Sequence, residues 1–130
     1  MNQLILVISS IFITLIFFKS GTDHLKNFAN LKTTSLFLST KFPFNKFNKY
    51  FNHLVIIVSS LIEIISPLLI LLAIYVPKYS FLGKLAAYLL SFFILTTIVF
   101  IHNPVNKSER MNFLKNLSML GGVILLSQLI

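Results

Sequence analysis

Apolar residues fill four blocks of this chain, and polar residues gather in the connections between the blocks. The interruptions fall at Lys19, between Pro77 and Lys84, and around Pro104. An α-helix of about 20 apolar residues spans the hydrocarbon core of a bilayer, which is about 30 Å thick. The pattern therefore predicts four membrane-spanning helices, which cover approximately residues 2–18, 54–76, 82–101 and 112–130.

We expect these helices to pack into a single all-α domain, a four-transmembrane-helix bundle comprising residues 1–130. A soluble helical core is the alternative. Only 11% of the residues are charged and 56% are hydrophobic, which leaves too little polar surface to cover such a core. The first block could instead be a signal peptide, but no basic residue precedes it and no small-residue cleavage site follows it. We therefore predict a retained helix.

The connection over residues 22–53 is long and polar, and its lysines are interleaved with phenylalanines. This amphipathic, basic–aromatic composition is typical of a segment at head-group depth, with rings in the interface and amines toward phosphate. We expect a short surface helix over residues 31–40, ended by Pro43. A flexible basic loop is the alternative.

The net charge of +8 is unevenly distributed between the two ends of the predicted bundle. Nine of the eleven basic residues belong to the first and third connections or the helix ends beside them: Lys19, Lys26, Lys32, Lys41, Lys46, Lys49, Lys107, Arg110 and Lys115. The positive-inside rule then places these two loops in the cytoplasm and both termini on the opposite side. Anionic lipid head groups are the expected partner of this charge. No aromatic-rich recognition motif accompanies it, so we exclude nucleic acid.

The second block contains an acid, Glu63, near its midpoint. An ionisable side chain there costs at least about 2.5–3.5 kcal/mol, so it normally faces protein. Ser59, Ser60 and Ser66 are three or four residues from Glu63 and share its helix face. Glu63 is therefore our candidate intramembrane functional acid, with an interhelical hydrogen bond as the equally weighted structural alternative.

The depth of Glu63 suggests which polar groups could meet it. Counting about 1.5 Å per residue from the basic side places Ser9, Ser10 and Ser91 at a similar level. We expect these hydroxyl groups to be its hydrogen-bond partners. Three further residues are expected to shape helix packing, because small residues permit close approach and an internal proline removes a backbone N–H. They are Gly121, Gly122 and Pro67.

The histidines form a second candidate site, since all three fall at helix ends on the basic side. Together with Asp23 they define an interfacial polar cluster of His24, His53 and His102, which could hold a quinone head group or a metal, or shuttle protons. Metal-ligand spacing such as HExxH is absent, so we assign no metal ligands. Cysteine, phosphate-loop and nucleophile–base motifs are also absent, and we expect no stand-alone catalysis.

The order of these features resembles the DoxX-like family of four-helix membrane proteins. The likeness is carried by residues 18–25, which include Gly21, by residues 63–73, which begin with the acid, and by residues 102–104 with 113–126. The resemblance implies a multi-pass membrane fold that is sometimes associated with redox enzymes and quinone chemistry.

Two functions follow from these observations. The first is a non-catalytic or quinone-associated subunit of a redox system, with Glu63 and His102 near a quinone or proton path. The second is a membrane scaffold that recruits a protein partner or cargo through the basic loop, without a redox role. A transporter of small solutes is a third and weaker hypothesis, because four helices form only a narrow pore unless the chain forms a homo-oligomer.

Overall fold

The computed structural model describes residues 3–28, 31–40, 46, 48–102, 104–105 and 107–130, and within these ranges the chain is helical with short turns. The described part of the chain contains α-helices and short 3-10 turns with assigned bounds. They are α1 (Gln3–Phe28), α2 (Leu31–Ser39), α3 (Lys49–Tyr75), η2 (Pro77–Tyr79), α4 (Ser80–Phe100), η3 (Lys107–Glu109) and α5 (Arg110–Leu129).

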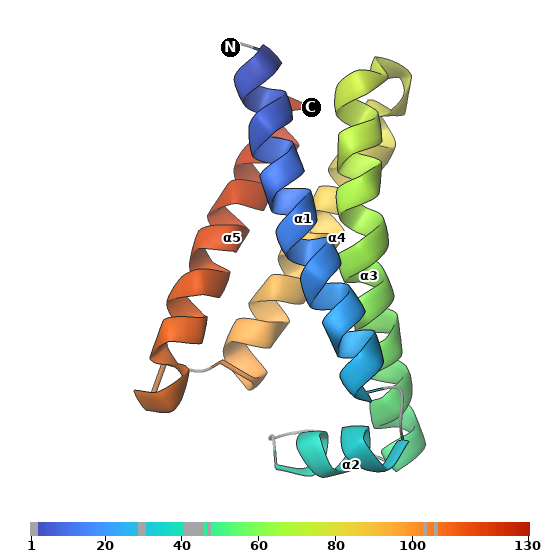
Figure 1. Cartoon of the computed structure of the whole chain (residues 1–130), viewed down its shortest axis with the longest axis vertical. Helices are drawn as coiled ribbons and strands as arrows, with labels where there is room; N and C mark the ends of the chain where they lie inside the picture. The colour runs from blue at the N-terminus through green and yellow to red at the C-terminus, as the bar shows by residue number, and fades with distance from the viewer. Residues whose placement is uncertain (1–2, 29–30, 41–45, 47, 103, 106) are drawn as a thin grey trace.

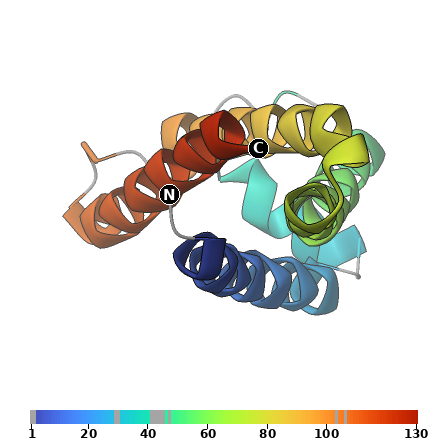
Figure 2. The ribbon, with the colours of Figure 1, turned by 90° about the horizontal axis from the view of Figure 1, so that it is seen from above.

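The four long helices run alternately up and down, so that each connection lies at one end of the molecule (Figure 1). Both termini and η2 are at one end, while α2 and the α4–α5 connection are at the other. The long helices pack in chain order: α1 packs on α3, α3 also packs on α4, and α4 also packs on α5 (Figure 2). Contacts between α1 and α5 are few.

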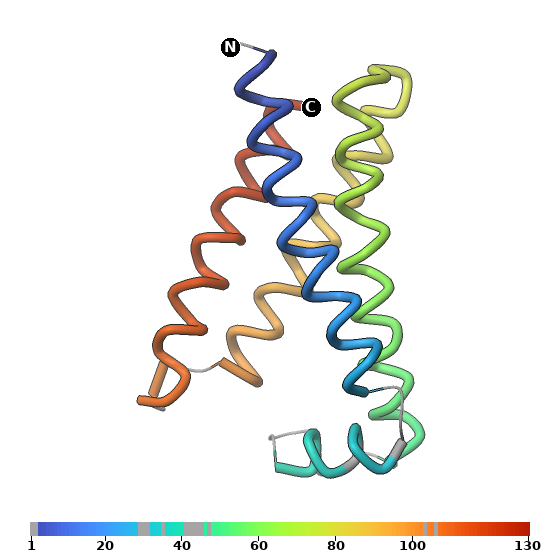
Figure 3. The backbone as a smooth tube through the Cα atoms, viewed as in Figure 1, coloured from blue at the N-terminus to red at the C-terminus, as the bar shows by residue number. Residues whose placement is uncertain are grey.

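The bundle is narrow at the terminal end and wide at the other. In Figure 3, α1 and α5 lie close together near the termini and diverge as they descend. The short helix α2 crosses below the wide end, where Thr34 and Leu38 are fully buried. The Thr34 hydroxyl donates to the Phe28 carbonyl at 2.8 Å and so ties α2 to the end of α1. A helix therefore forms where the sequence predicted one, while Pro43 lies outside the described residues, as do Lys41, Phe42, Phe44 and Phe47.

The core is apolar, and so is much of the outer surface. Ile70, Leu90 and Val123 are buried in the centre, whereas Phe12 and Phe81 are 62% and 76% exposed on the outside. Apolar side chains turned outward along whole helices suit a hydrocarbon surrounding. By length and composition, three spans can cross a membrane: Gln3–Phe28, Lys49–Tyr75 and Pro77–Phe100. The fourth long helix, α5, is outside this group.

The predicted end of the first helix at residue 18 was wrong, because α1 continues to Phe28. Lys19 does not end it, since its amine pairs with the Asp23 carboxylate one turn later at 2.8 Å. Gly21, a residue type that often ends a helix, is instead buried within α1 against α3. A Cβ added there would lie 2.7 Å from Ile64 Cγ1 and 3.0 Å from the Ser60 carbonyl oxygen. Packing against α3 thus favours continuation of the helix.

The residues expected to shape packing have different surroundings. Pro67 is buried within α3. Gly122 lies against α1, where an added Cβ would be 3.1 Å from Ile13 Cδ1, but Gly121 is exposed and an added Cβ would meet no described atom within 4 Å. The closest approach occurs instead at Gly83, where an added Cβ would collide with the Ala73 Cβ. The α3–α4 hairpin is thus held together by a small-residue contact that the sequence analysis overlooked.

Candidate functional site

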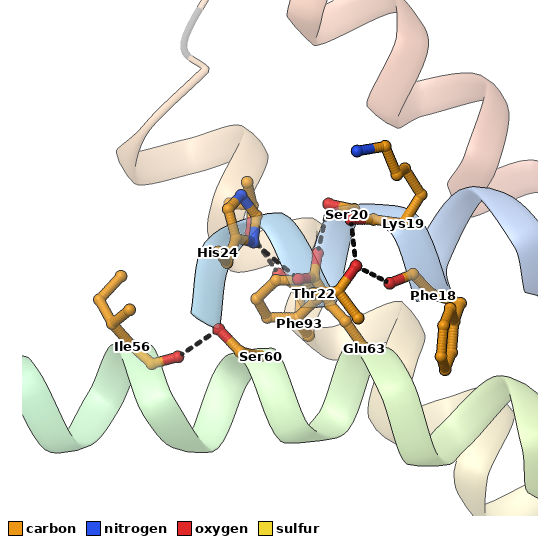
Figure 4. Close-up of polar contacts among 10 residues, drawn as sticks. Phe18, Lys19, Ser20, Thr22, His24, Ile56, Ser60, Glu63 and Phe93 are labelled. Atoms are coloured by element: carbon orange, nitrogen blue, oxygen red, sulfur yellow. Dashed lines mark hydrogen bonds and ion pairs between the residues drawn. The ribbon is translucent and has the colours of Figure 1, made fainter. Parts of the chain in front are cut away.

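Glu63 is the centre of the candidate site. It is only 3% exposed, and both of its carboxylate oxygens have partners from α1 (Figure 4). The ring Nδ1 of His24 lies 2.7 Å from Oε2, and the Ser20 hydroxyl donates to Oε1 at 3.2 Å. A buried carboxylate is tolerated only when it is paired and hydrogen-bonded in this way.

The extension of α1 places these partners. Ser20 and His24 are four residues apart, so they project from the same face of the helix. Gly21 lies beside them and allows the backbone of α1 to approach Glu63, since an added Cβ would be 3.1 Å from the Glu63 Cβ. The site therefore depends on the part of α1 beyond its predicted end.

The hydrogen-bond partners expected for Glu63 from helix depth were wrong. Ser10 donates to the Val7 carbonyl and Ser91 to the Ala87 carbonyl, each within its own helix. Ser9 is exposed. The depth count assumed that α1 ended near residue 18, whereas the longer helix brings its last two turns to the level of Glu63.

A second histidine–carboxylate pair lies at the junction of α4 and α5. The Nδ1 of His102 is 2.5 Å from Oε2 of Glu109, and the amide of Asn112 donates to the same oxygen at 3.0 Å. His102 and Glu109 are both largely shielded, with side-chain exposures of 25% and 20%. Asn106, whose place three residues before Glu109 resembles a capping box for the last helix, lies outside the described residues.

Both histidines line one cavity of about 350 Å³ in the wide end of the bundle. Its walls come from four helices: Phe28 from α1, Phe37 and Leu38 from α2, Ser59 and Ser60 from α3, and Phe93, Thr96 and Thr97 from α4. The cavity thus combines aromatic and aliphatic walls with hydroxyl groups and two imidazoles. Ligand sites in proteins have this character and a volume of roughly 300–1,000 Å³.

The other members of the predicted polar cluster point elsewhere. Asp23 pairs with Lys19 on an exposed face of α1. The Nδ1 of His53 lies 3.3 Å from the Thr34 hydroxyl, at the contact between α3 and α2. The structure therefore brings His24 and His102 to one cavity and separates Asp23 and His53 from it. Within the described ranges, no three His, Asp or Glu side chains are grouped to hold a metal ion.

Two residues of the site were missed by the sequence analysis, namely Ser20 as a partner of Glu63 and Gly21 as a packing residue. Ser20 and His24 carry a detectable signal, because polar residues four apart share a helix face. That signal has meaning only if the helix continues through Lys19 and Gly21. The contact between His24 and Glu63 joins positions 39 residues apart, which no local pattern encodes.

Chemically, each pair couples an imidazole to a carboxylate. The carboxylate engages Nδ1 and orients the ring, so Nε2 is the ring nitrogen that remains for a ligand. Such a pair can pass a proton between the buried acid and a group in the cavity. The described residues therefore offer two acid–base pairs at one largely apolar cavity.

Comparison of the chain with protein-family models, with curated proteins and with solved structures gives no match.

Proposed function

We propose that the chain is a multi-pass membrane protein whose cavity binds a quinone head group for a redox system. The observation that carries the proposal is the single cavity lined by two histidines, each backed by a carboxylate. The order of sequence features that resembles the DoxX-like family supports the same assignment.

The chemistry of the lining suits a quinone. The quinone ring is flat and apolar, and it can stack on aromatic side chains of the cavity such as Phe28 and Phe93. The two carbonyl oxygens of a quinone accept hydrogen bonds, and the imidazole N–H groups of His24 and His102 are the donors. The hydroxyls of Thr96 and Thr97 already donate to the Phe93 carbonyl. A carboxylate behind each histidine keeps the ring oriented toward the cavity.

The two histidine–carboxylate pairs supply the proton chemistry in this proposal. Oxidation of a quinol releases two protons together with two electrons, and a redox protein partner would accept the electrons. The His24–Glu63 pair would accept one proton from the quinol and the His102–Glu109 pair would accept the other, and each pair would return its proton when the quinone is reduced. The chain itself binds and orients the quinone and exchanges the protons.

The proposal includes a specific placement in the membrane. All four long helices cross it, with α5 as the fourth span, because the chain reverses direction at each connection (Figure 1). The basic connections on the α2 side face the cytoplasm, where their lysines contact anionic lipid head groups. The cavity then opens at the cytoplasmic interface, the depth at which a quinone head group resides.

The test is to purify the full chain from its membrane and measure co-purified quinone by absorbance and mass spectrometry. We expect bound quinone in the wild type and a loss of at least about tenfold in a His24→Leu, His102→Leu double variant, equivalent to about 1.4 kcal/mol or more. Asp23→Asn is the matched control, because Asp23 lies near His24 in sequence but pairs with Lys19 on the exposed face. It should retain the quinone.

A cofactor-free wild type that retains a protein partner on pull-down would contradict the quinone proposal. It would favour the alternative, a scaffold that recruits a partner or cargo. Binding of quinone that is equal in the wild type and the double variant would place the ligand outside this cavity.

A further inference from the structure

A second hollow lies on the outside of the bundle, between α3 and α4. It is an apolar groove of about 280 Å³. Its α3 wall includes Val58, Leu61 and Ile65, which are 43–50% exposed, so the groove opens on the outer face. Its floor includes Ala86, whose small side chain leaves the space between neighbouring leucines.

The groove and the histidine cavity follow one another along the same α3–α4 seam. On α3, Val55 and Ser59 line the cavity, and Ile62, Ser66 and Leu69 line the groove. These five residues are spaced alternately by four and three positions, so they form one continuous stripe on the helix.

On the facing helix α4, cavity residues are again followed by groove residues toward the terminal end, but with decreasing residue numbers because α4 is antiparallel to α3. On α4, Thr96 and Phe93 line the cavity, while Leu89, Ala86 and Leu82 line the groove. They are again spaced by three and four residues and form one stripe. The two helices thus carry a succession of lining residues, here called the track, whose polar part lines the cavity at the wide end of the bundle and whose apolar part lines the groove toward the termini.

We propose that this track binds one amphiphile, with its head group in the histidine cavity and its hydrocarbon tail in the α3–α4 groove. The inference rests on the proposed function and adds a requirement for the prenyl tail of the quinone. From Val55 to Leu69 the track is about 21 Å long at 1.5 Å per residue. The groove accounts for about 16 Å of this length, from Val58 to Leu69, which is close to the roughly 15 Å of hydrocarbon in one leaflet.

The direction of the track supports this occupant. An amphiphile in the leaflet beside the wide end has its polar head at the basic interface and its chain directed toward the bilayer centre. Along the α3–α4 seam, the cavity with its polar groups likewise lies at the basic end and the apolar groove lies beyond it toward the termini. A phospholipid chain or a helix of a second copy could fill an apolar groove, but neither would require it to adjoin a cavity lined by His24 and His102.

The test uses the full chain in nanodiscs and two probes, a tail-less benzoquinone and a prenylated quinone with a photoreactive group on its tail. After irradiation, we expect the label on peptides of α3 and α4 that line the groove. Excess tail-less benzoquinone should remove most of this label, because it displaces the head group from the cavity.

Two variants fill the groove, and one matched variant does not. Ala86→Phe fills the floor and Ile65→Phe narrows the exposed rim, so one remains informative if the other fails to fold. Each should lower groove labelling by about tenfold, the effect of losing a few buried methylene groups. Each should bind the tail-less benzoquinone as the wild type does. Leu68→Phe is the control, because Leu68 is 47% exposed on α3 and is not among the groove residues.

The outcomes separate this inference from the proposed function. Labelling spread over the outer faces of α1 and α5 would overturn the tail site. Groove labelling that excess benzoquinone does not reduce would also overturn it and would indicate a separate phospholipid chain or prenyl tail. In both cases, binding of the tail-less benzoquinone would leave the cavity proposal standing. Failure of that probe to bind would overturn both.

Discussion

Glu63 combines burial with a complete set of hydrogen bonds from α1. Its carboxylate accepts a hydrogen bond from the Ser20 hydroxyl and pairs with the His24 ring. Both partners belong to α1 and precede Glu63 by about 40 residues in the sequence. The His24–Glu63 pair can serve both as the interhelical contact that holds α1 against α3 and as the acid–base pair that exchanges a proton. Substitutions that remove one role at a time can therefore distinguish them.

Glu63→Gln retains an acceptor oxygen for Ser20 but removes the acid. We expect unfolding stability within about 1 kcal/mol of the wild type, together with loss of the proton-dependent function. Glu63→Leu removes every acceptor and leaves His24 and Ser20 without this partner, which should cost about 1–3 kcal/mol. Thermal unfolding in detergent and quinone-linked activity of the assembled system are the measurements. Full activity of Glu63→Leu would contradict both the functional and the structural role.

At the scale of elements, three glycines mark where helices touch and one marks where they do not. Gly21 faces α3 beside Glu63, Gly83 faces Ala73 in the α3–α4 hairpin, and Gly122 faces Ile13 of α1, whereas Gly121 faces away from the described chain. In lipid, apolar surface alone does not hold helices together, so close packing at such positions carries much of the association energy.

Gly21→Ala should therefore destabilise the protein, because the added methyl group would lie 2.7 Å from Ile64 Cγ1 and close to the Ser60 backbone oxygen. The expected cost is about 1–3 kcal/mol, the usual range for overpacking. Gly83→Ala should show a loss in the same direction. Gly121→Ala is the matched control and should be neutral or stabilising by up to about 1 kcal/mol, since alanine favours the helix. Equal unfolding temperatures for Gly21→Ala and Gly121→Ala would refute the proposed close contact.

At the scale of the whole molecule, the two ends differ in charge and in shape. The narrow end holds both termini and η2, whereas the wide end holds α2, the cavity and the basic connections (Figure 1). Both histidines of the cavity are at the wide end, which is therefore the end where the proposed quinone head group would bind.

This asymmetry predicts which end faces the cytoplasm. The chain contains no cysteine, so single cysteines introduced as Lys78→Cys and Lys107→Cys can be labelled without background. In intact cells, a membrane-impermeant thiol reagent should label position 78 and should reach position 107 only after permeabilisation, because the basic loops are retained inside. Reversal of this pattern would contradict the topology. Labelling of both positions from outside would contradict a membrane crossing by α4, the single long helix between them.

The amino-acid sequence by itself determined the all-helical class, the approximate positions of the apolar helices and the unusual place of Glu63. These properties are local, because hydrophobic length and the 3.6-residue period specify a helix without reference to its neighbours. Only the tertiary structure decided where α1 ends, since Gly21 becomes a helix residue through its contact with Ile64 and Ser60. It also decided which groups meet Glu63, and that His24 and His102 share a cavity. Those facts depend on contacts between distant segments, which residue spacing along one helix cannot specify.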